Sequence, residues 1–135
     1  EAEAVSVGTG LQIAGANCVV VIENAGLFQA IEAIRCLPLD MRVPLVMFIS
    51  WTSRVPADQS PDDAIEEGLA RGGGAATHAV WQGLMTDRVL DTIGIPHSTL
   101  ETANGVKLVS WAFGKARDTR GPVAILLDRL EGAPQ

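Results

Sequence analysis

Two short polar segments carry side chains suited to ligand binding, and each directly follows an apolar run. Residues 23–27 (ENAGL) follow the apolar residues 18–22, and residues 50–54 (SWTSR) follow the apolar residues 43–49. In open parallel sheets, ligands bind beyond the carboxyl ends of the strands. We therefore expect both segments to emerge on one edge of a sheet, close to each other.

Each polar side chain in these segments has a functional and a structural interpretation. Asn24 donates its amide to a ligand, or it caps the helix that follows. Trp51, next to the cationic Arg54, contacts a ligand or packs under the sheet edge. The sequence leaves both alternatives open.

A lone histidine, His78, follows the glycine run at 72–74 and lies in a predicted loop. Imidazole titrates near neutrality, which suits proton transfer or carboxylate binding, although a solvated or structural role is the simpler alternative. His97, at the start of a predicted strand, is interpreted as structural.

Several familiar signatures are missing from the sequence. It contains no H-E-x-x-H, no paired-cysteine metal site, no Walker loop and no G-x-S-x-G elbow. The glycines at 8 and 10 resemble the start of a dinucleotide fingerprint, but Ile13 replaces the third glycine and the segment precedes a strand. Cys18 and Cys36 are expected to be two buried thiols in a reducing compartment.

Three nearly all-apolar runs predict strands buried on both faces, as in a parallel sheet. They are residues 18–22, 43–49 and 122–127, and a weaker strand is expected after Pro96. Helical segments alternate with these strands. This alternation predicts an α/β fold: an open, mostly parallel sheet with helices on both faces and right-handed crossovers.

Capping residues and glycines predict where the helices begin and end. An opening helix over 2–15 contains two glycines expected to admit another backbone, and Ser60 caps a helix that runs to Ala70. Thr86 is predicted to cap the next helix, which ends at Thr92 before Gly94. The last helix, 102–117, is expected to bury one face, made of Val106, Val109, Phe113 and Ala116.

Length, charge and composition narrow the class of protein. The 135 residues are 47% hydrophobic and are read as one domain, 1–135. Sixteen acidic against ten basic side chains give a net charge of −6, which argues against a nucleic-acid binder. No apolar run is long enough to span a membrane and no basic leader is visible, so a cytoplasmic protein is expected.

An ordered set of motifs resembles the pyrimidine-binding domain of thiamine diphosphate enzymes, most strongly the phosphonopyruvate and sulfopyruvate decarboxylase branch. Residues 1–10 (EAEAVSVGTG) are similar to that family's Glu-x-x-Ala-x-x-x-Ala-x-Gly segment. Residues 24–27 (NAGL) and 44–51 (PLVMFISW) follow in the family's order, as do 82–86 (QGLMT), 90–96 (LDTIGIP) and 122–127 (PVAILL).

This resemblance implies a cofactor site. The family's glutamate, here Glu1, hydrogen-bonds the aminopyrimidine N1′ and thereby favours the tautomer that forms the thiazolium ylide, which attacks a 2-oxo acid and leads to loss of carbon dioxide. The resemblance also places Asn24, Gly26 and Leu27 near the pyrimidine, and His78 near the substrate.

The resemblance also implies a partner and a substrate class. The Gly-Asp-Gly…Asn segment that binds Mg²⁺ and the diphosphate is missing, so a diphosphate-binding domain or beta subunit is expected to supply that half, giving an oligomer with no metal ligand in this chain. The substrate would be a small anionic 2-oxo acid such as sulfopyruvate or phosphonopyruvate. Arg54 and Arg88 are the candidate cations, with Trp51 beside them.

Departures from the family pattern keep other functions open. Phe28 and Gln29 replace the family's Gly-Asn, glycines and alanines replace the acidic run before His78, and the strand and helix that precede the glutamate in the family are not seen before Glu1. One alternative is a binding or regulatory module that keeps the fold without the chemistry. Another is an unrelated flavodoxin-like nucleotide binder.

Overall fold

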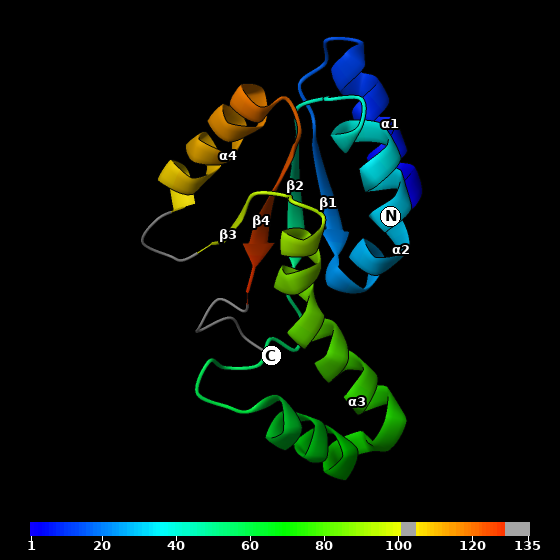
Figure 1. The fold of residues 1–135 in the computed structure, drawn as a ribbon, viewed down its shortest axis with the longest axis vertical. Coiled ribbons are helices and arrows are strands. Elements are labelled where there is room, and N and C mark those ends of the chain that lie inside the picture. Colours follow the sequence, from blue (N-terminus) through cyan, green and yellow to red (C-terminus); the bar gives the residue numbers. More distant parts are fainter. Residues whose placement is uncertain (101–104, 129–135) are drawn as a thin grey trace.

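A computed structural model describes residues 1–100 and 105–128 and contains a parallel sheet (Figure 1). Its strands are β1 (Val19–Glu23), β2 (Leu45–Ser50), β3 (His97–Thr99) and β4 (Pro122–Leu127), in the spatial order β1-β2-β4-β3. All three pairings are parallel. The predicted parallel α/β fold is confirmed, and the strand after Pro96 exists as β3.

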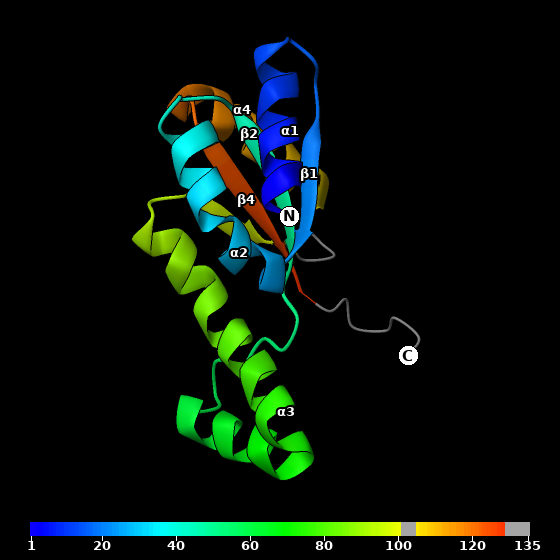
Figure 2. The ribbon, with the colours of Figure 1, turned by 90° about the vertical axis from the view of Figure 1, so that its right-hand side faces the viewer.

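Helices cover both faces of the sheet, as expected (Figures 1 and 2). The helices are α1 (Ala2–Ile13), α2 (Asn24–Ile34), α3 (Pro61–Thr92) and α4 (Gly105–Thr119). Side chains alternate along β2 and β4, so Met47 and Leu126 pack with α1 and α2 while Val46 and Ile125 pack with α4. Two apolar layers result, one on each face of the sheet.

Helix α3 is bent at Gly72 and Gly73, whose φ/ψ values of −160°/17° and 62°/−140° are not helical. Ser60 caps its start as predicted, since the Ser60 hydroxyl accepts from the Asp63 N–H at 3.1 Å. The expected start of a second helix at Thr86 is wrong. The chain resumes helical geometry directly after the bend, and Thr86 lies inside the helix, where its hydroxyl bonds the Gln82 carbonyl at 2.7 Å.

Two other expectations about helix faces need correction. Val106 is 85% exposed on α4, because the buried face is centred on Leu108 and Ala112, flanked by Val109 and Phe113; residues 102–104 lie outside the described part. On α1, Gly8 meets a side chain, Val20, instead of a backbone, and a Cβ at Gly10 would meet nothing within 4 Å.

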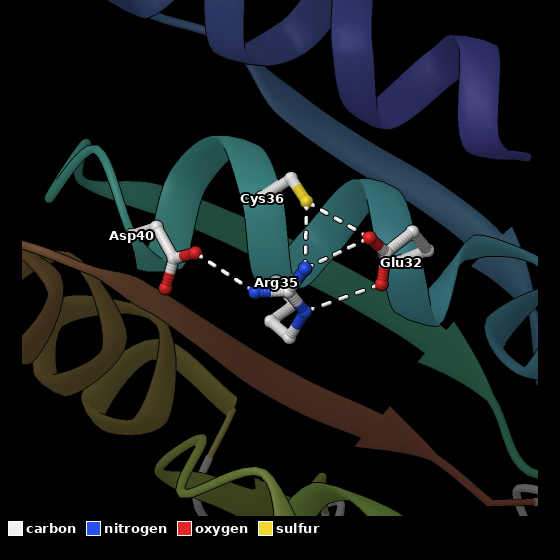
Figure 3. A network of polar contacts seen from close by, with 4 residues as sticks. All are labelled: Glu32, Arg35, Cys36 and Asp40. Atoms are coloured by element: carbon white, nitrogen blue, oxygen red, sulfur yellow. Dashed lines mark hydrogen bonds and ion pairs between the residues drawn. The ribbon is translucent and has the colours of Figure 1, made fainter.

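A polar network closes the end of α2, where the chain turns through the short π-helix η1 (Arg35–Leu39) (Figure 3). Arg35 bonds Glu32 at 2.8 Å and Asp40 at 3.0 Å, and the Cys36 thiol donates to Glu32 at 3.0 Å. The Arg35 guanidinium, followed by the Cys36 thiol, lowers the pKa of Glu32 to about 2, and the Glu32 carboxylate raises the pKa of Cys36. Cys36 is exposed and Cys18 is only half-buried, so the expectation of two buried cysteines is wrong.

In the part of the chain that the structure describes, four turns after helices adopt a left-handed backbone, and two of them do so without glycine. Gly15 and Gly94, after α1 and α3, have φ of 82° and 73°. Arg42 and Arg120, after η1 and α4, have φ of 56° and 49°. Left-handed geometry costs a residue with a Cβ about 1–2 kcal/mol, which glycine avoids.

No helix in the part of the chain that the structure describes is long and apolar enough to cross a membrane.

We predict that Arg120→Gly raises the free energy of unfolding by about 0.5–1 kcal/mol, because relief of the left-handed strain exceeds the extra chain entropy that glycine loses on folding. Urea unfolding followed by circular dichroism measures the change. The matched variant Gly94→Ala places a Cβ in the same geometry and should lower the free energy of unfolding by about 1 kcal/mol. Equal stability of all three chains would contradict the strain at these turns.

Candidate active site

The side chain of Asn24 joins the carboxyl ends of β1 and β2 to helix α3. Its amide nitrogen donates to the Thr52 carbonyl at 3.1 Å and to the Thr86 hydroxyl at 3.2 Å. Its amide oxygen accepts from the Thr52 hydroxyl at 2.6 Å. The two predicted loops therefore meet as expected. Asn24 does not cap α2: the capping position is Glu23, and no side chain bonds the free N–H groups there.

A second connection ties the same loop to the same helix. Trp51 is 8% exposed, and its indole N–H donates to the Gly83 carbonyl at 2.7 Å. A Cβ at Gly83 would overlap the Ser53 carbonyl, and Ser53 has a φ of 56°. Of the two interpretations of Trp51, packing under the sheet edge is confirmed, and Gly83 allows the helix and the loop backbone to touch.

The carboxyl group of Glu1 lies against Gly26, in the first turn of α2. A Cβ at Gly26 would overlap the Glu1 side-chain carbons and its Oε1 atom. Glu1 is exposed, whereas Gly26 and the neighbouring Leu27 are buried. The structure thus brings together a carboxylate and a glycine that are far apart in the sequence, at the same edge as Asn24.

Two adjoining hollows lie between the loop after β2 and helix α3. The larger has a volume of about 1030 Å³ and is lined by Trp51, Arg54, Glu67, Arg71, Asp128 and other residues. The smaller, of about 310 Å³, is lined by Trp51, Arg54, Pro56, Gly83, Asp87, Arg88 and others. The larger hollow lies beside the carboxyl ends of β2 and β4, where Ser50 and Leu127 line it, and the smaller one adjoins the end of β2 at Trp51.

The two candidate cations, Arg54 and Arg88, both line the smaller hollow. The Arg54 guanidinium lies 4.7 Å from the centre of the Trp51 ring and is paired with Asp128 at 2.6 Å. Within the described residues the Arg88 guanidinium has no ion pair, and only its backbone N–H bonds Asp87. One arginine is thus held in place and the other is available to an anion.

His78 lies elsewhere on α3. It is in the helix and not in a loop, because the helix resumes directly after Gly73. Its exposed ring lies 3.0 Å from the Gln82 amide, and it lines neither hollow. The structure does not join His78 to Glu1 or to the arginines.

Sequence reasoning missed the residues that assemble this edge, namely Thr52, Gly83, Thr86 and Asp128. A signal was present in residues 82–86, because the spacing of Gly83 and Thr86 puts both on one helix face. That spacing marks a docking face and does not reveal its partners.

No protein-family model matches this chain. One curated protein aligns with almost all of it: the sulfopyruvate decarboxylase subunit alpha of Methanococcus maripaludis, 28% identical over 131 residues, covering 96% of this chain and 68% of that protein. The chain is similar to this decarboxylase subunit. The resemblance predicted from the motifs is confirmed.

We predict that Gly83→Ala destabilises the fold by about 1–3 kcal/mol, because the new methyl group would displace the Ser53 carbonyl and overpacking carries that cost. Denaturant unfolding gives the free energy. The control Gly10→Ala adds the same methyl to a helix where nothing is near, and it should gain up to about 1 kcal/mol. A neutral Gly83→Ala would mean that the loop and helix are not in contact.

Thr86→Val tests the Asn24 connection separately. We expect a loss of about 1–3 kcal/mol, because the change leaves one buried Asn24 amide hydrogen without an acceptor. Thr92→Val is the matched control, since Thr92 makes the same bond to its own helix, to the Arg88 carbonyl at 2.7 Å, but is exposed. Equal effects of the two substitutions would show that the Asn24 bond is not formed.

Proposed function

We propose that this chain is the pyrimidine-binding part, similar to an alpha subunit, of a thiamine-diphosphate-dependent 2-oxo acid decarboxylase. The observation that carries the proposal is the contact of the Glu1 carboxyl with Gly26, because it joins the two segments whose resemblance implies the pyrimidine site. The similarity to a protein named as a sulfopyruvate decarboxylase subunit supports the same activity class.

The residues at this edge fit one end of the cofactor. Glu1 presents an exposed carboxylate, and the missing side chain at Gly26 leaves room for it. Leu27 anchors the turn in the core with no exposed surface. Asn24 uses both amide hydrogens within the protein, so we assign it to holding this turn in place beside the pyrimidine.

When bound, the cofactor supplies a carbon nucleophile and an electron sink for decarboxylation. The residues of this chain would control the proton on the Glu1 carboxyl group and the orientation of that group. Glu1 would hold a proton at the pyrimidine N1′ atom, and the first turn of α2, fixed through Asn24, would keep the carboxyl group in place. Trp51 and Gly83 keep the neighbouring loop in register with α3.

Two arginines at the smaller hollow support the substrate class that the resemblance implies. A sulfonate or phosphonate carries oxygens that a guanidinium binds with two parallel hydrogen bonds. Arg88 is free to make them, and Arg54 is already oriented by Trp51 and Asp128. We therefore propose a small anionic 2-oxo acid of this type, with His78 as a further candidate substrate contact.

We propose that a separate diphosphate-binding domain or subunit supplies the other half of the site. Thiamine diphosphate needs Mg²⁺ and a diphosphate-binding domain or beta subunit, and we propose that an oligomer with such a partner is the active, cytoplasmic form. The relative's designation as a subunit alpha is consistent with an assembly of this kind.

The experiment combines this chain with a candidate diphosphate-binding subunit, Mg²⁺ and thiamine diphosphate, and measures carbon dioxide released from sulfopyruvate and from phosphonopyruvate. Glu1→Gln should slow release by about 100-fold or more, the lower range for a lost proton-transfer group. Glu3→Gln, an exposed carboxylate in the first turn of the same helix, should leave the rate unchanged.

Calorimetry on the same complexes separates the alternatives. A complex that binds no thiamine diphosphate would favour the non-catalytic module, and nucleotide binding by the isolated chain would favour the flavodoxin-like binder. An unaffected Glu1→Gln variant would overturn the proposed role of Glu1.

A further inference from the structure

A cluster of basic side chains lies at the end of the sheet where the strands begin, opposite the candidate site at their carboxyl ends. Arg42 and Arg120 precede β2 and β4, which are paired neighbours, and the Leu45 N–H bonds the Gly121 carbonyl between them at 3.4 Å. The two turns lie side by side at the top of Figure 1, and Figure 2 shows the same arrangement. Lys115 and Arg117 come from the last turns of α4. We call these four residues the arginine edge.

The backbone at the two turns favours glycine over arginine. Arg42 and Arg120 occupy left-handed positions at which this same chain uses Gly15 and Gly94 after its other helices. Nothing in the folding of these turns calls for a charged side chain. We therefore look for the role of these arginines in the partner that their guanidinium groups contact.

The arginine edge is also electrostatically unpaired. In the described residues none of its four cations has an ion pair. Asp118, which is close to Lys115 and Arg117 in the sequence of α4, is not ion-paired with them. Lys115 and Arg117 complement the negative end of α4, which explains part of the cluster. The arginines before β2 and β4 have no such explanation, since backbone bonds already close both turns.

A matching acidic surface lies at the other end of the molecule, on the first half of α3 and the loop before it. It consists of Asp58, Asp62, Asp63 and Glu66, none of which has an ion pair among the described residues. The neighbouring Glu67 is different, because it is paired with Arg71. Figure 1 shows this part of α3 at the bottom and the turns that precede β2 and β4 at the top.

We propose that the arginine edge of one molecule binds the acidic first half of α3 in a second copy of this chain. The two surfaces are at opposite ends and cannot meet within one molecule, so the contact is head-to-tail. Four cations of one copy would meet four anions of the other, all without an ion pair among the described residues, and this charge complementarity favours a second copy as the partner.

Net charge sets the conditions under which the contact forms. Each copy carries −6, so two copies repel at very low salt. At about 0.1 M salt the screening length is about 10 Å, which suppresses repulsion between distant charges but not attraction between groups in contact. At about 0.5 M the contacts themselves weaken, so association should pass through a maximum at intermediate salt.

Sedimentation equilibrium of the whole chain at 0.1 and 0.5 M NaCl tests the proposal. We expect a dissociation constant roughly fivefold or more weaker at the higher salt, as for exposed charge pairs. Arg42→Gly/Arg120→Gly should abolish association while raising the melting temperature, because it also relieves the two left-handed turns. Lys107→Gln removes an exposed cation outside the arginine edge and should leave association unchanged.

Exchanging the charges of the two surfaces tests whether a second copy of this chain is the partner that binds the arginine edge. We use two double variants, Arg42→Glu/Arg120→Glu and Asp58→Lys/Glu66→Lys. Each should be monomeric alone, and the two should associate when mixed. Asp58 and Glu66 are chosen because they lie outside the first turn of α3, where acidic residues stabilise the helix. A wild-type chain that stays monomeric at 0.1 M, a mixture that stays monomeric, or association indifferent to Arg42→Gly/Arg120→Gly would overturn the proposal. Binding of an added acidic peptide or nucleic acid without self-association would overturn it as well.

Discussion

The buried amide of Asn24 is the interaction on which the candidate site depends. It joins two loops and a helix that the sheet alone would not hold together, since β1 and β2 end at the same edge but their following segments run in different directions. Asn24 has no exposed surface, so an unmade bond there would cost far more than the same bond at the surface. The position of Gly26, and with it Glu1, follows from this fixed point.

The places of the strands could be predicted because their cause is local in sequence. The expected burial of β1 on both faces is wrong, since Val19 and Val21 are exposed on the face where α4 packs on β2 and β4. Residues 122–127 form β4 at the predicted bounds, since a β-branched and aliphatic run buried on both faces has few alternatives. The cap at Ser60 and the end of α3 before Gly94 could also be predicted, because capping and left-handed turns depend on single residue types.

The contacts of the site could not be predicted in the same way, because they depend on partners distant in sequence. Thr86 looks like a helix cap from its neighbours, and only the packing of α3 on the sheet edge shows that its hydroxyl serves Asn24. Cys36 looks like a core residue until the π-turn carries it to the surface beside Glu32. The expectation that Glu1 and residues 24–27 belong to one site came from resemblance, since no periodicity relates residues 1 and 26.

The bend at Gly72 and Gly73 divides α3 into parts with different structural duties. The second part carries Leu90 into the core and Thr86 into the Asn24 network, whereas no residue of the first part belongs to either apolar core cluster of the described chain. Backbone amides of the first part can therefore exchange with solvent through a local opening that leaves the sheet folded, whereas those around Thr86 and Leu90 are tied to the unfolding of the sheet. The two parts of α3 on either side of the bend are thus expected to unfold separately.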